Sequence, residues 1–122
     1  LKIREQFGRK IGSFQALQHR SADVHIQISL TRAVVIAAAA RMDSTREATA
    51  RMVAASRAKA RASEAAAIVT RGCVQLHGGI GYTDVADIGL FLRKAMVWMP
   101  LFGSAAVHRT RFRALSPEQD DE

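Results

Sequence analysis

The sequence predicts an all-α protein, a left-handed helical bundle built around two long antiparallel helices. Two long segments carry small and apolar side chains at helical spacing, over residues 13–42 and 46–76. No segment shows the alternation of polar and apolar residues that is typical of a half-buried strand. The two segments are separated by only a few residues, which favours an antiparallel pair.

The first long helix is expected over residues 13–42. One seam repeats every seven residues through Leu17, Val24, Thr31 and Ala38. A second seam lies beside it at Ser21, Ile28, Val35 and Met42. The break falls at residues 43–46, where Ser44 followed by Glu47 fits a capping box, with Ser44 as the N-cap of the next helix.

The second long helix is expected over residues 46–76, with small residues on two faces. One face steps alternately by four and three residues through Ala48, Met52, Ala55, Lys59, Ala62, Ala66, Val69, Cys73 and Leu76. Lys59 is expected to extend its ammonium outward to solvent. The opposite face contains Ser56, Ala60, Ser63, Ala67 and Thr70. A helix that is small on both sides is expected at the centre of a bundle.

Two shorter helices are expected to complete the fold. Asp84 is a plausible N-cap for a helix over residues 85–97, whose inward side chains are expected to be Ile88, Phe91, Leu92 and Ala95. Ser104 can cap a last helix that ends near Leu115. The domain is therefore expected to span residues 1–115, followed by an acidic, disordered tail over residues 116–122.

The charge distribution indicates which kinds of partner the protein binds. The net charge is +7, with +8 in residues 1–61 (twelve Lys and Arg, four Asp and Glu) and −1 in residues 62–122 (six and seven). A basic half favours anionic partners. Arginines scattered along the helices, without interleaved aromatic residues, make nucleic acid a remote alternative. We expect no nucleic acid, and no membrane because no stretch approaches about 20 uncharged apolar residues.

The cysteine and histidine residues argue against a disulfide and against a metal site. The single cysteine, Cys73, cannot form an internal disulfide, which fits a reducing, cytoplasmic compartment. It lies in an apolar run and is expected to be a buried structural thiol. Around His77 no second ligand stands at metal-binding spacing, so no metal site is expected.

Three segments are unusual for a plain bundle. They are Arg-Glu-Gln-Phe-Gly-Arg-Lys-Ile-Gly-Ser-Phe-Gln-Ala-Leu-Gln-His over residues 4–19, Gln-Leu-His-Gly-Gly-Ile-Gly-Tyr over 75–82, and Leu-Arg-Lys-Ala-Met-Val-Trp-Met-Pro-Leu-Phe-Gly-Ser over 92–104. Taken singly, the first reads as a charged turn between helices. The second reads as a glycine-rich helix end, and the third as a core helix with its loop.

Together, in this order and spacing, the three segments resemble the acyl-CoA dehydrogenase family over about residues 3–115. The resemblance implies the C-terminal helical bundle of an FAD-dependent enzyme about three times longer, whose tetramers pair as two dimers. It implies that the chain begins near the end of the first bundle helix, which is mostly missing. The implied reaction is α,β-dehydrogenation of an acyl-CoA, in which a carboxylate removes the α-proton and the flavin accepts the β-hydride.

The resemblance also implies roles for individual residues. Arg4 would contact the FAD pyrophosphate, and Gln6 and Phe7 would lie against the same cofactor. Gln15 would bind FAD across the dimer interface. The adenosine diphosphate part would come from the neighbouring subunit to the segment that contains Gln75, His77, Gly78 and Gly79. Ser104 would help to hold the adenosine part.

One position departs from the family pattern. Phe102 stands where many relatives carry the catalytic glutamate, and phenylalanine cannot accept a proton. No catalytic residue is therefore assigned, and the isolated chain is expected to be inactive. Two alternatives stay open: a domain of a catalytic subunit, or a non-catalytic partner in a heteromeric dehydrogenase, with a sterol side chain among the candidate substrates. The chain is expected to form homo- or hetero-oligomers through its bundle, and acyl-CoA would bind only to the complete enzyme.

Overall fold

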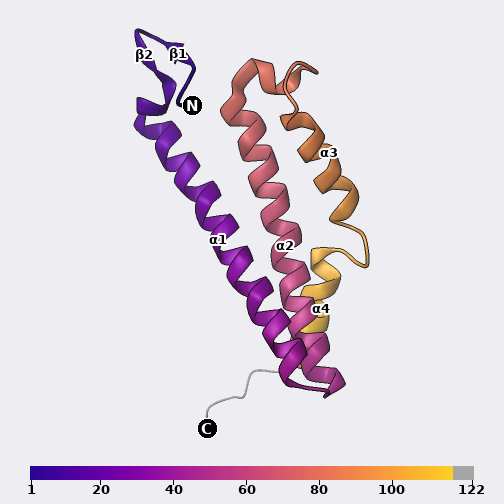
Figure 1. The fold of residues 1–122 in the computed structure, drawn as a ribbon. Helices are drawn as coiled ribbons and strands as arrows, with labels where there is room; N and C mark the ends of the chain where they lie inside the picture. The colour runs from indigo at the N-terminus through magenta and orange to yellow at the C-terminus, as the bar shows by residue number, and fades with distance from the viewer. Residues whose placement is uncertain (117–122) are drawn as a thin grey trace.

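The computed structural model describes residues 1–116, so the predicted acidic tail, apart from Ser116, lies outside the described residues. The described chain is an up-and-down helical bundle, and the predicted all-α class is confirmed (Figure 1). The long helices are α1 (Gln15–Ser44) and α2 (Ala48–His77), which run antiparallel. Two short helices follow, α3 (Ile88–Trp98) and α4 (Ala105–Leu115), and both lie along α2.

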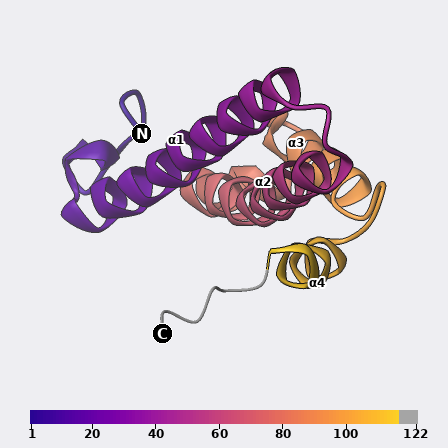
Figure 2. The ribbon, with the colours of Figure 1, turned by 90° about the horizontal axis from the view of Figure 1, so that it is seen from below.

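Helix α2 is the central element, as its two small faces predict. It packs against α1, α3 and α4, and it lies between α1 and α4 when the bundle is viewed from below (Figure 2). The buried residues of α2 are small ones, among them Ser56, Ala60, Ser63 and Ala65. Gly72 shows how closely the helices approach, since a Cβ at this position would lie 3.3 Å from a methyl group of Val24 on α1.

Helix α1 packs by one face only. The predicted seam at Leu17, Val24, Thr31 and Ala38 is half-buried. The second predicted seam is wrong in part, because Ile28 and Val35 are exposed, while their neighbours Gln27 and Val34 turn inward. In the middle of α1 the second covered row therefore lies three residues and not four after the first, and the stripe still follows the alternating three- and four-residue steps of helix packing.

The helix turn at residues 44–47 differs from the predicted capping box. Ser44 is the last residue of α1, and its hydroxyl donates to the carbonyl of Arg41 (3.2 Å). Glu47 is itself the N-cap of α2, because its carboxylate accepts from the backbone N–H groups of Thr49 and Ala50. These bonds, that of Ala50 first, hold the pKa of Glu47 below its ordinary value. The capping residue was therefore placed three positions too early.

The third helix also begins later than predicted. Asp87, not Asp84, occupies the N-cap position of α3, and its side chain makes no capping hydrogen bond. Phe91 was predicted to face inward but is 64% exposed, whereas Ile88, Leu92 and Ala95 are half-buried. A helix that packs on one side against α2 covers only a narrow stripe, and Phe91 lies outside that stripe.

The first residues contain strands, which the sequence did not predict. Strand β1 (Glu5–Gln6) pairs antiparallel with β2 (Arg9–Lys10) across a turn at Phe7 and Gly8. Both turn residues have positive φ, 55° and 74°, as a tight hairpin requires. Strands of two residues are too short to leave an alternation in the sequence. The end of a preceding helix, implied for this segment, is not seen within residues 1–10.

Lys59 was expected to reach solvent, but the structure corrects this. Its ammonium donates to the carbonyl oxygens of Trp98 (3.0 Å) and Met99 (3.1 Å) and to the hydroxyl of Ser63 (2.9 Å). Carbonyls at a helix C-terminus lack partners within the helix and attract cations. The only lysine in the small-residue seam thus caps the end of α3.

We expect Ala65→Leu to lower the free energy of unfolding by about 1–3 kcal/mol, because Ala65 is only 3% exposed and three added carbons would overpack the interior. Ala62→Leu is the matched control: Ala62 is half-buried and lines a groove of about 330 Å³ between α2 and α3, where a larger side chain has room. Thermal and urea unfolding of both variants measures the difference. Equal losses for the two variants would contradict this assignment of the packed face.

Candidate functional site

The structure brings two of the three unusual segments together at one end of the bundle. The hairpin of residues 5–10 lies beside the end of α2 and the glycine-rich 3-10 turn η2 (Gly78–Tyr82) that follows it (Figure 1). The Arg4 guanidinium donates to the carbonyl of His77 at 3.1 Å. The predicted site residues Arg4, His77 and Gly78 are therefore neighbours, although Arg4 lies more than 70 positions from the other two in sequence.

Gly78 ends α2 in a conformation that favours glycine. Its φ is +66°, and a Cβ here would lie 3.2 Å from the Arg4 guanidinium. At Gly79 a Cβ would meet nothing within 4 Å, so the backbone there is open to an approaching group. The turn thus joins a basic side chain to exposed backbone, a combination that suits a phosphate-bearing ligand.

Arg4 retains the capacity to bind an anion. It uses one nitrogen for the His77 carbonyl, and a guanidinium has five N–H donors. The nearby end of α2 carries the negative pole of the helix dipole, so an anion here depends on arginine and not on the helix. Arg4 is exposed, and its other donors can form a forked contact with phosphate oxygens.

The remaining residues of this end are exposed and oriented by local contacts. Gln75 accepts a hydrogen bond from the Tyr82 hydroxyl (3.2 Å), a contact that the sequence analysis missed. His77 donates from Nδ1 to the carbonyl of Cys73 (2.7 Å), since a carbonyl can only accept, and its ring is exposed. Tyr82 and His77 thus each make one hydrogen bond that orients the ring beside the glycine turn.

The hairpin presents Phe7 to solvent. The Phe7 ring meets Phe14 edge to face at a centroid distance of 6.1 Å, and the Arg9 guanidinium lies 4.1 Å from the centre of the Phe14 ring. Gln6 is exposed on the same hairpin, and Gln15, the first residue of α1, is exposed just after it. Gln6, Phe7 and Gln15 are thus all exposed, the first two on the hairpin that follows Arg4 and the third on the first turn of α1.

Ser104 does not join this cluster. It is the N-cap of α4, and its hydroxyl accepts from the Val107 N–H at 3.4 Å. His108, one turn later, contacts Ser56 on α2, whereas His77 ends that helix. At 1.5 Å per residue, this places Ser104 about 30 Å along α2 from the glycine turn. One copy of the chain therefore separates the two groups of predicted site residues.

Phe102 lies in the connection between α3 and α4, with its side chain 87% exposed. The residue has φ 60°, in the left-handed region that few non-glycine residues adopt. It offers neither a proton acceptor nor a hydrogen bond through its side chain. The predicted absence of a base at this position follows from the residue type, and the structure adds that the ring points away from the bundle.

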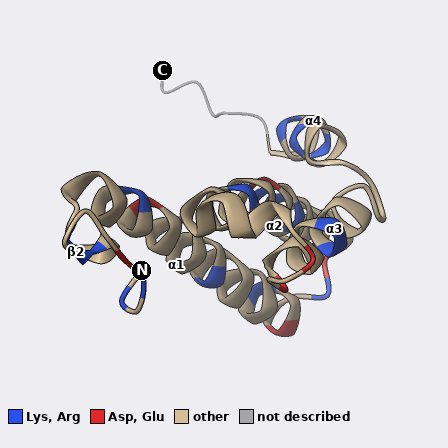
Figure 3. Ribbon diagram, turned by 90° about the horizontal axis from the view of Figure 1, so that it is seen from above, with Lys and Arg blue, Asp and Glu red and all other residues tan. Residues whose placement is uncertain are grey.

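The described residues do not indicate a reactive thiol or a metal site. Cys73 is half-buried, and burial raises the pKa of its thiol, which disfavours the reactive thiolate. Among residues 1–116, no group of three or more His, Cys, Asp or Glu side chains could hold a metal ion. Within residues 1–116, Lys and Arg occur on the N-terminal segment and on each of the four helices, and Figure 3 shows them spread over these elements.

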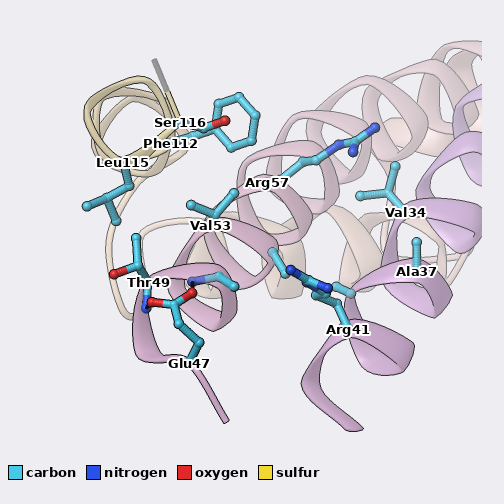
Figure 4. Close-up of a pocket in the computed structure, with 13 residues that line it drawn as sticks. Val34, Ala37, Arg41, Glu47, Thr49, Val53, Arg57, Phe112, Leu115 and Ser116 are labelled. Atoms are coloured by element: carbon cyan, nitrogen blue, oxygen red, sulfur yellow. Dashed lines mark hydrogen bonds between the residues drawn. The ribbon is translucent and has the colours of Figure 1, made fainter. Parts of the chain in front are cut away.

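A separate groove of about 480 Å³ lies at the opposite end of the bundle, between α1, α2 and α4 (Figure 4). Its lining includes apolar side chains such as Val34, Val53 and Phe112, and the polar side chains of Arg41 and Arg57 extend along it. None of the site residues predicted from the motifs lines this groove. Its apolar side chains mark an incompletely covered side of the bundle.

A family model for the C-terminal domain of acyl-CoA dehydrogenases matches residues 1–114. The chain belongs to the acyl-CoA dehydrogenase family. Its match covers both the hairpin and the glycine turn, so the resemblance on which the site residues rest is confirmed at the level of the family.

Two curated relatives are similar to this acyl-CoA dehydrogenase domain over most of its length. Acyl-CoA dehydrogenase IpdE2 of Mycolicibacterium smegmatis is 42% identical over 113 residues, which cover 93% of this chain and 34% of the relative. The 3-sulfinopropanoyl-CoA desulfinase of Paraburkholderia xenovorans is 39% identical over 110 residues, which cover 90% of this chain and 27% of the relative. The chain thus spans about a third or less of the length of these relatives.

A solved structure supports the same fold. A chain from a structure described as electron transferring flavoprotein of Acidaminococcus fermentans superposes with a TM-score of 0.87 at 37% sequence identity. The match covers 96% of the present chain and 30% of the other. The bundle seen here is therefore one part of a larger architecture in that structure.

Proposed function

We propose that this chain serves as the C-terminal domain of an FAD-dependent acyl-CoA dehydrogenase, where it contributes contacts to FAD and part of the oligomer interface. The observation that carries the proposal is the contact of Arg4 with the end of α2, beside glycines that leave the backbone open. An arginine with free donors next to exposed backbone suits a pyrophosphate. The substrate would be an acyl-CoA thioester, and the place of action the cytoplasm.

The residues present fit FAD in chemical type. Arg4 would pair with the pyrophosphate, and Gln6 and Phe7 would lie against the cofactor from the hairpin. Gln15 and the segment of Gln75, His77, Gly78 and Gly79 would bind parts of FAD that two subunits share. Bound FAD supplies the acceptor for a hydride. Ser104 lies about 30 Å along α2 from the glycine turn. It would therefore contact only the adenosine part of a second FAD, one bound mainly by another copy or subunit.

The contribution of this chain would be binding and orientation, because it offers no base at residue 102. A general base must lie within hydrogen-bond reach of the proton that it removes. The Phe102 ring cannot do this, so the carboxylate would come from a segment or subunit beyond this chain. This observation favours a second candidate function, in which the chain is the non-catalytic partner of a heteromeric acyl-CoA dehydrogenase. One relative is named for another reaction, desulfination, so an assay has to test the proposed dehydrogenation directly.

Flavin binding tests the proposal. We expect the purified chain to hold no stoichiometric FAD, and the complete assembly that contains it to be yellow. In that assembly, Arg4→Met should raise the dissociation constant of FAD about 10- to 100-fold, because it removes a charge-assisted hydrogen bond of about 1.5–3 kcal/mol. Arg32→Met, an exposed arginine on α1, is the control. Unchanged FAD affinity in Arg4→Met, measured by flavin fluorescence, would refute the assigned role of this arginine.

Self-association tests the proposed interface. Helix α1 is long and apolar enough to cross a membrane by length and composition alone, although it contains Asp23 and Arg32. The apolar character of α1 comes in part from exposed side chains such as Ile26, Leu30 and Ile36. A second copy of the chain that packs on these side chains would account for it as well as a membrane would. We expect light scattering to detect dimers or larger species, and Ile36→Glu to shift them toward monomer. A monomer at every concentration for the unmodified chain would contradict the interface.

A further inference from the structure

The groove between α1, α2 and α4 is lined by two arginines that have no partner among the described residues. Arg41 comes from the last turn of α1 and Arg57 from α2, and both side chains lie along the groove (Figure 4). Within residues 1–116, the guanidinium groups that donate to other residues are those of Arg4, Arg51 and Arg109. Both groove arginines therefore keep their donors for an anion from outside the described residues.

One carboxylate also lines this groove, and it already has hydrogen-bond partners. Glu47 accepts from the backbone N–H groups of Thr49 and Ala50, which fixes it at the start of α2. By charge it balances at most one of the two arginines. The described lining therefore keeps a net positive charge beside its apolar side chains.

The residues that follow the groove in sequence have the opposite charge. Ser116, the last described residue, lines the groove next to Leu115 at the end of α4. Residues 117–122 read Pro-Glu-Gln-Asp-Asp-Glu, with four carboxylates and no cation. Because the whole chain carries +7, residues 1–116 carry +11. Charge complementarity therefore favours this acidic segment as the occupant of the groove.

The acidic segment is also long enough for this role. Six extended residues span at most about 20 Å. The groove follows α2 from Glu47 to Arg57, which is about 15 Å of helix. Since the segment starts at a residue that lines the groove, the length of the groove lies within its reach.

We propose that residues 117–122 bind back along this groove as an internal ligand, with their carboxylates paired to Arg41 and Arg57. A carboxylate accepts two parallel hydrogen bonds from a guanidinium, and the covalent link to α4 holds the segment at a high effective concentration beside its site. The bound segment competes with a second copy or another subunit for the groove. None of the residues assigned to FAD lines the groove, so the inference does not depend on the proposed function.

The pairing is tested by carbon NMR titration of the carboxyl groups in the chain of residues 1–122. A guanidinium beside a carboxylate lowers its pKa, so at least one carboxyl of residues 117–122 should have a pKa about one unit lower in the unmodified chain than in Arg41→Gln/Arg57→Gln. Arg93→Gln, an exposed arginine on α3 outside the groove, is the matched control and should leave all four pKa values unchanged. Salt at about 1 M, where the Debye length is about 3 Å, should largely remove the difference.

A second variant leaves the groove itself unaltered. In Asp120→Asn/Asp121→Asn, the backbone amide signal of Ala54, which lines the groove, should shift in NMR spectra. The signal of Gly72, about 27 Å farther along α2, should not shift. An unchanged Ala54 signal would contradict the proposed contact.

Three further outcomes would overturn the proposal. The first is equal pKa values for all four carboxyls in the unmodified chain and in a folded Arg41→Gln/Arg57→Gln variant. The second is a pKa difference that grows with protein concentration, since the acidic segment of a second copy would then fill the groove. The third is the absence of the pKa difference in the complete assembly, which would show that another segment or subunit occupies the groove there.

Discussion

Replacing Gly81 with alanine is expected to lower the free energy of unfolding by about 3 kcal/mol, within the range for overpacked and strained sites. A Cβ at residue 81 would lie 2.6 Å from the carbonyl oxygen of Val74 and 2.9 Å from the Cβ of His77. Backbone atoms in the last turn of α2 cannot move aside without breaking helical hydrogen bonds. The glycine turn and the end of α2 should therefore separate.

Gly79→Ala is the matched control for this prediction, since it lies in the same turn and a Cβ there meets no atom within 4 Å. Its stability should stay within about 0.5 kcal/mol of the unmodified chain, as for most exposed substitutions. Denaturant unfolding of the two variants measures the contrast. In the complete assembly, Gly79→Ala should still weaken FAD binding if the proposed close approach is correct. A Gly81→Ala variant as stable as the unmodified chain would show that the turn is packed differently.

The isolated chain is expected to show no acyl-CoA dehydrogenase turnover, and Phe102→Glu alone should not create it. A general base contributes about 10²–10⁴-fold to a rate, or roughly 3–5 kcal/mol. Positioning of the reacting groups contributes about 7–11 kcal/mol. A carboxylate at residue 102 supplies at most the smaller contribution, because the match of this chain covers only 34% of a relative such as acyl-CoA dehydrogenase IpdE2.

An electron-acceptor assay with added FAD and short, long and steroidal acyl-CoAs measures this outcome for both forms of the chain. Turnover by the unmodified chain would reveal a base that residues 1–116 do not suggest. Turnover by Phe102→Glu alone would show that this domain positions the substrate unaided. Activity that depends on a co-expressed companion subunit would favour the partner-subunit function over the domain of a catalytic subunit.

Local patterns predicted most of the fold. Helix periodicity placed α1 and α2 to within two residues at each end, and Ser104 was identified as the N-cap of α4. These features depend on neighbours within one or two turns, which are visible in the sequence. The same locality explains the errors at Ser44 and Asp84. Several polar residues near a helix start can cap it, and the packing of the turn decides which one does.

The candidate site was only partly accessible in this way. The motifs named Arg4 and the glycine turn through their resemblance to a family, but the direct bond from Arg4 to His77 depends on how the hairpin folds back onto α2. The contact between Ser56 and His108 joins residues 52 positions apart, with no local pattern around either. Lys59 was misplaced for a related reason, since its acceptors belong to another helix.

The sequence by itself determined the helical class, the central place of α2 and the absence of a proton acceptor at residue 102. Each depends on side-chain type or on spacing along one helix. Only the tertiary structure decided that Arg4 meets the glycine turn, that Ser104 lies far from it, and that His108 holds the backbone of Phe102. These are contacts between segments distant in sequence. Their geometry depends on how α2 packs against its neighbours, a property of the whole bundle that no single segment contains.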